Sequence, residues 1–294
     1  MKNLVTTHTN NQRHWVGDGF PVRTIFGYND LGRRLSPFLL MDYAGPADFT
    51  PANHLRGVGE HPHRGFETVT IVYSGEVTHR DSSGGGGMIT PGDVQWMTAG
   101  SGLVHEEMHG KDFAAKGGNF EMIQLWVNLP AKDKMTKPRY QGIKNAQIPR
   151  VEFANGAGYA RIIAGDYEGS QGPAKTFTPM NLWDVRLAQG AEQEFRMPKG
   201  HTTAVFVLSG KVSLGTGEEL TEATIAILEK DPENFTLKAS EDAKILILGG
   251  APIEEPIVGY GPFVMNSMQE IQQAFYDFQA GKMGSLDRVE GTES

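Results

Sequence analysis

Short runs of β-branched and aromatic residues alternate with turn-forming residues over positions 56–128. The clearest runs are Thr68–Ser74, Asp93–Met97 and Phe120–Asn128. Gly, Pro, Asp and Ser interrupt the sequence between them, at Ser74-Gly75, at residues 83–87 and at Pro91-Gly92-Asp93. Closely spaced short strands joined by such turns predict an antiparallel sandwich or barrel.

A second β-rich stretch covers residues 151–250, after a segment rich in Lys, Gln and Pro. Its expected strands are Tyr159–Ile163, Leu182–Leu187, Thr202–Ser209, Thr224–Leu228 and Lys244–Leu248. The pattern therefore predicts an all-β protein with an N-terminal domain at 1–130, a linker at 131–150 and a C-terminal domain at 151–294.

The two stretches share a strand and turn pattern. Thr68–Val77 aligns with Thr203–Val212, and both segments are an apolar strand closed by Ser-Gly and a charged residue. Ten such positions are limited support for a duplication by themselves. The offset of 135 residues between them nevertheless fits two β domains of equal size, and a chain of 294 residues is long enough for two cores.

One amphipathic helix is expected near the C-terminus. Ser267 as N-cap and Glu270 three positions later form a capping box, and Gly281 is placed to end the helix. The apolar positions of one face are Ile271, Ala274, Phe275 and Phe278. This face is expected to pack against a barrel, without a chemical role.

Composition excludes several classes of function. The formal net charge is −8 and no block rich in Lys or Arg occurs, which disfavours direct nucleic-acid binding. The chain has no Cys, so any metal must be bound by His and carboxylate. Neither an N-terminal signal segment nor an apolar stretch of about eighteen residues is found. We therefore expect a cytoplasmic protein without membrane contact, or a nuclear one in a eukaryote.

Two pairs of side chains have the spacing of metal ligands. His61 and His63 lie two residues apart just before an expected strand, so both side chains point to one face. His105 and Glu107 repeat this spacing after a Gly-rich turn at residues 100–102. Together the pairs offer nitrogen and oxygen ligands that suit Fe(II), Mn, Ni, Cu or Zn and leave coordination positions open.

Two alternatives compete with this interpretation. The histidines could be surface or hydrogen-bonded side chains. In addition, residues 105–109 match the H-E-x-x-H pattern of zinc proteases, which requires a helix. Gly100, Gly102 and Gly110 flank the segment closely, and they favour a strand and turns instead.

Several longer segments resemble the signature segments of the pirin family. They are His61–Thr70, Pro91–Gly100, Ser36–Asp42, Gln124–Pro130 and Gly261–Asn266. The resemblance extends over nearly the whole chain and implies a bicupin, two antiparallel β-barrel or jelly-roll domains with a C-terminal helix.

The resemblance also implies one divalent metal ion in the N-terminal barrel, Fe(II) in the first place, with Mn, Ni, Cu, Co or Zn as alternatives. The family's ligands fall on His61, His63, His105 and Glu107. At the offset of 135 residues, the positions of the first two are occupied by Arg196 and Pro198. The C-terminal barrel is therefore expected to lack the metal.

The sequence leaves the roles of one further acid and three further histidines undecided. Cupins in general take their carboxylate ligand from the first motif, which makes Glu67 the alternative to Glu107. Glu67 otherwise becomes a supporting or structural acid. His54, His79 and His109 are candidate pocket or surface residues, for which no function is expected.

The family includes quercetin 2,3-dioxygenases, which open a flavonol ring with O2 and release CO. The resemblance implies a small aromatic substrate, with Glu107 both binding the metal and taking the proton of the 3-hydroxyl. An apolar barrel mouth formed by Phe66, Trp96 and Met97 would accept the ring.

A second hypothesis follows from other members of the family, which resemble metal-dependent protein-binding modules. In that case the metal's oxidation state would change a surface read by a protein partner, and the chain would act as a transcriptional co-regulator or modulate a metabolic enzyme. A purely structural metal is disfavoured because structural sites are usually closed.

Overall fold

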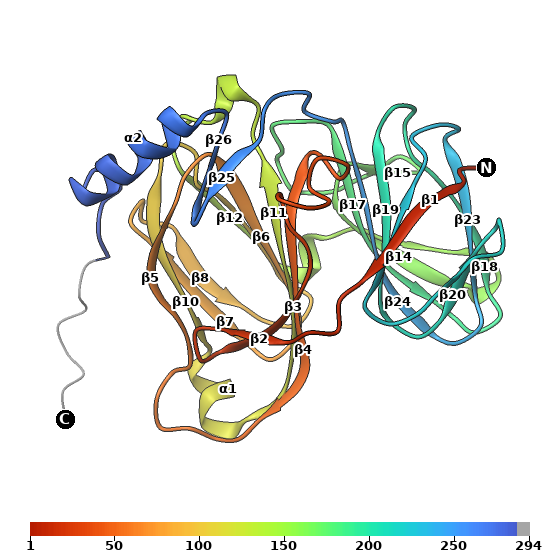
Figure 1. Cartoon of the computed structure of the whole chain (residues 1–294). Coiled ribbons are helices and arrows are strands. Elements are labelled where there is room, and N and C mark those ends of the chain that lie inside the picture. The colour runs from red at the N-terminus through yellow and green to blue at the C-terminus, as the bar shows by residue number, and fades with distance from the viewer. Residues whose placement is uncertain (287–294) are drawn as a thin grey trace. The chain divides into compact units, whose positions relative to one another are not determined.

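The computed structural model describes residues 1–286 and divides into two compact units, each built from separated segments (Figure 1). Unit 1 contains Met1–Arg13, Arg23–Tyr43 and Ile143–Glu254. Unit 2 contains His14–Val22, Ala44–Gly142 and the described residues from Glu255 onward. The sequence predicted one continuous range for each domain, whereas the terminal segments of the chain are exchanged between the units.

Two antiparallel sheets form the framework of unit 2. The larger has the order β12 (Arg139–Ile143), β9 (Val94–Thr98), β6 (Phe66–Ser74), β11 (Gly118–Asn128), β4 (Phe38–Phe49), β3 (Phe20–Phe26) and β2 (His14–Val16). Strands β3 and β4 continue into unit 1. The smaller sheet has the order β5 (Gly57–His63), β10 (Leu103–His109), β7 (Val77–Asp81) and β8 (Gly86–Ile89).

Unit 1 repeats this plan. Its larger sheet has the order β1 (Leu4–Thr9), β22 (Thr224–Leu228), β19 (Thr202–Ser209), β24 (Ala243–Gly250), β17 (Met180–Leu187), β14 (Gly158–Ala164) and β13 (Arg150–Glu152). Its smaller sheet has the order β18 (Glu192–Arg196), β23 (Asn234–Ala239), β20 (Val212–Leu214) and β21 (Glu219–Leu220). The aligned segments of the predicted repeat lie in β6 and β19, which hold the same third position in their sheets.

The remaining elements are short. They are the hairpins β15 (Asp166–Tyr167) with β16 (Ser170–Gln171) and β25 (Val258–Tyr260) with β26 (Phe263–Met265), the helices α1 (Lys111–Lys116) and α2 (Met268–Gln279), and single 3-10 turns at Ala131–Asp133, Asn145–Gln147 and Ala154–Gly156. The all-β, two-domain class with a C-terminal helix is thus confirmed. The expected linker is more ordered than its composition suggested, since residues 139–143 form the edge strand β12.

The N-terminal strand β1 pairs with β22 in unit 1, with Thr7 opposite Ala226 and Thr9 opposite Thr224. This pairing gives the edge of β22 a backbone partner, and it explains why residues 1–13 belong with the C-terminal half of the chain. Local sequence pattern carries no signal for a partner more than 200 residues away.

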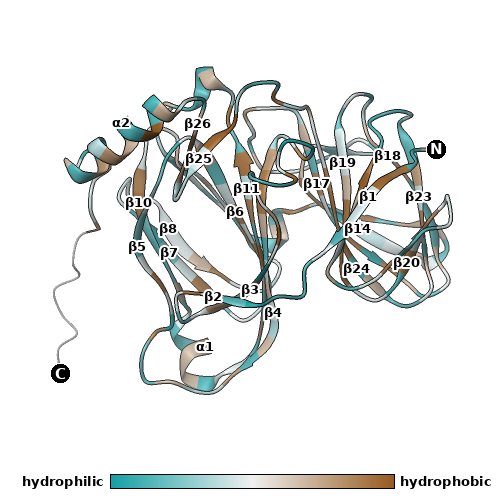
Figure 2. Ribbon diagram, in the orientation of Figure 1, coloured by the Kyte–Doolittle hydropathy of each residue, from teal (hydrophilic) through white to brown (hydrophobic). Residues whose placement is uncertain are grey.

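The two barrels are filled differently. In unit 1 apolar side chains from both sheets meet in one continuous core that includes Trp183, Phe195 and Phe235. In unit 2 an apolar core that includes Phe20, Val72 and Phe120 fills only part of the interior. Strand β5, which pairs with β10 in the smaller sheet, consists mostly of hydrophilic residues (Figure 2). Buried polar side chains, among them Gln95, His105 and Glu107, share this interior with apolar ones such as Phe66 and Met97.

Helix α2 begins at the predicted N-cap, Ser267, but the Glu270 carboxylate bonds the backbone N–H of Asn266 and not that of Ser267, so half of the predicted capping box forms. The Ser267 hydroxyl accepts a hydrogen bond from the Glu270 backbone N–H at 3.3 Å, and the Glu270 carboxylate accepts one from the Asn266 backbone N–H at 3.0 Å. Ile271 and Ala274 are buried in a cluster with Val104 of β10 and Phe263 of β26. Phe278, expected on the same face, is 37% exposed. Within residues 1–286, no helix is long and apolar enough to cross a membrane.

The cap of α2 gives a direct test of this description. Replacing Ser267 by Ala is expected to destabilise the first turn by about 1 kcal/mol, because the Glu270 N–H loses its acceptor. Replacement by Asp is the matched control, since a carboxylate accepts the same bond. Amide hydrogen exchange of α2 should be faster in Ser267→Ala than in Ser267→Asp, and equal exchange in both variants would contradict the cap.

Candidate metal centre

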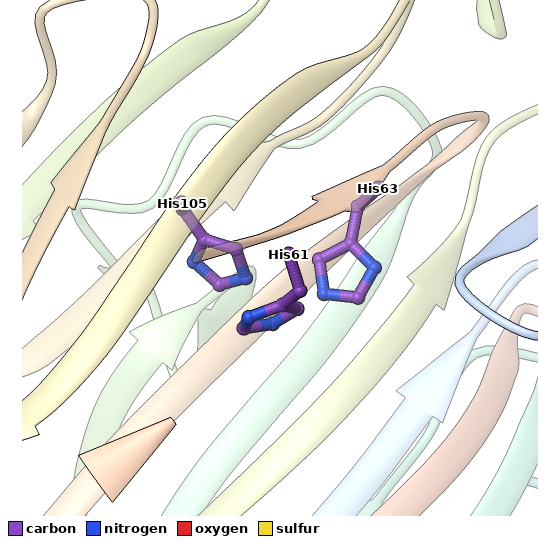
Figure 3. Close-up of side chains that lie close together, drawn as sticks. All are labelled: His61, His63 and His105. Carbon is purple, nitrogen blue, oxygen red and sulfur yellow. The ribbon is translucent and has the colours of Figure 1, made fainter. Parts of the chain in front are cut away.

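Pairing of β5 with β10 brings three predicted histidines together. His61 lies opposite His105, and His63 lies opposite Leu103. One nitrogen from each imidazole falls within 4.8 Å of the others, and Figure 3 shows the three rings turned toward one another. Strand register therefore brings His105 next to two histidines that lie more than forty residues before it in the sequence.

This strand pairing also decides against the protease pattern. Residues 105–109 belong to β10, so His105 and His109 are not placed on one face of a helix. His109 instead donates from Nε2 to the Gly19 carbonyl oxygen, 2.8 Å away, and stacks on Phe120. Because a carbonyl oxygen only accepts, this nitrogen carries the proton and is unavailable to a metal.

Each ring of the cluster has its Nδ1 atom engaged. Nδ1 of His61 lies 2.8 Å from the Gly59 carbonyl oxygen, and Nδ1 of His63 lies 3.1 Å from the Pro262 carbonyl oxygen. Carbonyl oxygens only accept, so the hydrogen-bond network assigns the proton to Nδ1 in both rings. The Nε2 atoms consequently keep their lone pairs, which is the form that binds a metal.

His105 supplies the clearest sign of a cation site. Its Nε2 atom is buried, and no hydrogen-bond partner for it occurs among residues 1–286. An unsatisfied buried nitrogen costs roughly 1–3 kcal/mol, so such atoms usually have an explanation. A metal ion held between His61, His63 and His105 supplies one, and the residues present fit that ion.

Desolvation keeps these imidazoles in the ligand form. Burial and, second, the neighbouring His61 lower the pKa of His63 to about 3. Burial and the neighbouring His63 also hold the pKa of His105 well below its usual value. Both rings are therefore neutral at pH 7, as a metal ligand must be. His61 is only half-buried, so the cluster meets solvent on its side.

Glu107 lies deeper along β10, opposite His79 of β7. Its carboxylate falls within 4.8 Å of ring nitrogens of His105 and His79, in a group separate from His61 and His63. Three donors hold it: the amides of Gln95 and Gln124, the latter at 2.8 Å, and the Thr70 hydroxyl at 3.3 Å. The carboxylate thus adjoins the three histidines through His105, while neutral donors occupy its oxygens.

Glu67 faces away from this centre. Side chains alternate along β6, and Thr70, which bonds Glu107, points to the interior. Glu67 is an odd number of residues from Thr70 and points to the opposite face, where the Thr98 hydroxyl donates to it at 2.7 Å. This geometry favours Glu107 over Glu67 as the carboxylate of the site.

The aromatic wall differs from the predicted one. Phe66 does lie at the site, since its ring centroid is 5.1 Å from that of His63. Trp126 of β11 stacks on Phe66 at 4.2 Å and also contacts His63. Met97 shares the inner face with Trp126 because both lie opposite Thr68. Trp96 lies one residue before Met97, opposite Val69, and therefore points outward. The expected role of Trp96 therefore passes to Trp126.

The other histidines separate clearly. His54 is exposed, 3.6 Å from Asp18, and lies outside the cluster. His79, for which the sequence predicted no role, is buried against His105, with their Nδ1 atoms 3.2 Å apart. Its neighbour Asp81 repeats the two-residue spacing that identified the other pairs. That spacing was the available signal for this additional pair.

The C-terminal segment holds His63 in place. Backbone of β26 runs beside residue 64, with the Val264 N–H donating to the Arg64 carbonyl at 3.1 Å. The Arg64 guanidinium then pairs with Asp277 of α2 at 2.9 Å, and both side chains are largely buried. Gly65 is required by this approach, because a Cβ atom there would lie 2.1 Å from the Val264 oxygen. The Pro262 carbonyl is thereby fixed next to His63.

Comparison with known proteins places this site in a family. Two family models match the chain, Pirin at residues 19–127 and the Pirin C-terminal cupin domain at residues 182–284. A candidate quercetin 2,3-dioxygenase from Pseudomonas aeruginosa is 57% identical over 96% of this chain and 98% of its own. Pirin from Mus musculus is 37% identical over 91% of this chain and 89% of its own. The crystal structure of quercetin 2,3-dioxygenase from Acinetobacter baumannii, 54% identical, superposes with a TM-score of 0.95 and covers 97% of this chain and 99% of its own.

Glu67 gives a pH-dependent test of its burial. Burial raises the pKa of Glu67 to about 7, although the Thr98 hydroxyl and Arg139 act in the opposite direction. Above pH 4.5 the unfolded chain releases the proton while the folded chain keeps it. The side chain therefore lowers the free energy of unfolding between pH 4.5 and 7, by at most about 3 kcal/mol.

Glu67→Gln removes this titration and keeps the shape of the side chain. Urea unfolding of the metal-free proteins should show the variant gaining stability relative to wild type when the pH is raised from 5 to 8. A difference between the two proteins that is the same at both pH values would show that Glu67 is not a proton-holding buried acid.

Proposed function

Because this chain belongs to the pirin family of two-domain cupin proteins, we propose that it binds one divalent metal ion through His61, His63, His105 and Glu107. The observation that carries the proposal is the buried Nε2 atom of His105, which has no hydrogen-bond partner among residues 1–286 and lies beside the other two imidazoles. Fe(II) is the proposed metal in the first place, with Mn, Ni, Cu, Co or Zn as alternatives that nitrogen and oxygen ligands also suit.

We further propose that the chain is a dioxygenase that opens the flavonol ring of quercetin, or of a related enolic aromatic, with O2 and release of CO. The names of the two similar quercetin 2,3-dioxygenases support this substrate class. When bound, the metal would supply a Lewis acid for the substrate oxyanion and the redox chemistry that O2 requires.

The protein's own residues would orient the substrate and move its proton. The stacked pair Phe66 and Trp126 offers an aromatic wall beside His63 for a planar ring. Glu107 would accept the proton of the flavonol 3-hydroxyl at a carboxylate oxygen. Gln95 and Gln124 are neutral donors that hold this carboxylate in place without a cation that would compete for its charge.

The ligand assignment is tested by metal content. Anaerobically purified protein, loaded with Fe(II) and freed of excess metal, should hold one ion per chain. His63→Ala removes one of three converging lone pairs and should weaken affinity by at least tenfold. His54→Ala is the matched control, because His54 is exposed and lies outside the cluster. Full metal content in His63→Ala would refute the site.

The reaction is tested by following O2 consumption and CO release with quercetin. Wild-type protein loaded with metal should release one CO for each O2 consumed. Glu107→Gln, at equal metal occupancy, should be slower by roughly 100-fold or more because the acceptor of the substrate proton is lost. Wild type that binds metal fully yet consumes no O2 with flavonols would overturn the dioxygenase proposal and favour the protein-binding alternative.

A further inference from the structure

Behind His105, a buried chain of three side chains crosses from β10 to β7. Nδ1 of His105 lies 3.2 Å from Nδ1 of His79, and Nε2 of His79 lies 3.1 Å from Oδ2 of Asp81. The side chains of His79 and Asp81 are both 0% exposed. Strand register places the chain, because His105 lies directly opposite Asp81 across the β10–β7 ladder.

The Asp81 carboxylate fixes the direction of each hydrogen bond in this row of side chains. The Asp81 carboxylate can only accept, so the proton between it and His79 belongs to His79 Nε2. His79 Nδ1 then has a lone pair, and the proton shared with His105 must come from His105 Nδ1. His105 is consequently left with its lone pair on Nε2, the atom that faces His61 and His63 and has no partner within the described chain.

Neighbouring residues hold Asp81 and His79 in place. The second oxygen of Asp81 accepts hydrogen bonds from the Ser83 backbone N–H at 2.8 Å, the Ser83 hydroxyl at 2.6 Å and the Gly85 backbone N–H at 3.0 Å. Tyr140 of β12 stacks on the His79 ring, with centroids 5.0 Å apart and planes 15° from parallel. A Cβ atom at Gly85 would collide with Asp81 and Tyr140, so this position requires glycine.

His105 needs a side-chain acceptor where the other two ligands do not. His61 and His63 reach the carbonyls of Gly59 and Pro262, which lie on neighbouring backbone. His105 lies within β10, an inner strand paired on both sides, where the backbone carbonyls serve the ladder. Only a side chain from the neighbouring strand can orient its ring.

We propose that His79 and Asp81 are positioning residues that fix the tautomer of His105 and so present its Nε2 lone pair to the metal. This inference rests on the ligand set proposed above. It assigns to β7 a role in metal affinity without direct contact with the ion, as carboxylate–histidine partners have in other metal sites. The rival is a second ion held by His79, His105 and Glu107, whose ligand atoms also lie within 4.8 Å of one another.

Asp81→Asn distinguishes a relay from simple packing, because it preserves shape and inverts the hydrogen bond. The three donors around Oδ1 hold the amide oxygen there, so the amide NH2 faces His79. His79 then becomes protonated on Nδ1, and His105 must move its proton to Nε2, which removes the ligand lone pair. Ser83→Ala is the matched control, since it removes one donor to Asp81 and leaves the contact with His79.

Two measurements on the full chain test this. Nitrogen NMR of histidine-labelled, metal-free protein should show Nδ1–H for His105 and Nε2–H for His79 in wild type and Ser83→Ala, with both reversed in Asp81→Asn. Titration with Ni(II) against a chelator should show an affinity about 10- to 100-fold weaker in Asp81→Asn and wild-type affinity in Ser83→Ala. His79→Leu, which can neither accept from His105 nor donate to Asp81, should also bind Ni(II) more weakly.

The outcomes separate the relay from the ligand set. Unchanged tautomers and affinity in Asp81→Asn, in protein that unfolds at the wild-type temperature, would overturn the relay. Two Ni(II) ions per wild-type chain and one in His79→Leu would also overturn it, because His79 would then be a ligand. Wild type with the expected tautomers and no Ni(II) binding would refute the proposed ligand set instead.

Discussion

The site depends on one constraint: three neutral imidazoles must direct their lone pairs to one point inside a desolvated barrel. Each ring has two nitrogens, and burial makes either of them costly to leave unsatisfied. The structure meets this by giving every Nδ1 a partner and leaving Nε2 for the centre. Those partners come from three separate places: Gly59 within β5, the segment before β26, and the strand β7. The strands and segments around the site hold these hydrogen-bond partners in position.

The two barrels differ in which side chains their corresponding strands direct to the interior. Strand for strand they share one order, with β5 and β10 of unit 2 corresponding to β18 and β23 of unit 1. In unit 1 those strands supply Phe195, Phe235 and Leu237 to a continuous apolar core. In unit 2 the corresponding strands supply histidines and Glu107. The barrel of unit 2 therefore combines an apolar core with hydrogen-bonded polar side chains, whereas in unit 1 the corresponding strands add to the apolar core.

Sequence alone was sufficient for features that local pattern determines. The strands at 202–209 and 224–228 have the expected bounds, and Ser267 caps α2 as predicted. Two-residue spacing also identified three histidines that the structure brings together. Features that depend on long-range register could not be predicted in this way. The exchange of β1 between units and the outward side of Trp96 are examples, because both follow from which strand pairs with which.

For Glu107, the sequence and the structure give different neighbours. Resemblance placed Glu107 with the three histidines, whereas in the structure it adjoins only His105 and is held by Gln95, Gln124 and Thr70. The pairing of β10 with β5 is irregular between His105 and Glu107, but its pairing with β7 is continuous, so Glu107 follows the register of β7. All three donors are neutral, and each can be exchanged at modest free-energy cost, because a typical hydrogen bond contributes only about 1 kcal/mol net. A carboxylate held in this way can turn toward a cation or accept a substrate proton without breaking an ion pair. Its environment is therefore compatible with both parts of the proposed role, whereas Glu67, on the outer face of β6, could reach the centre only if the strand slipped by one residue.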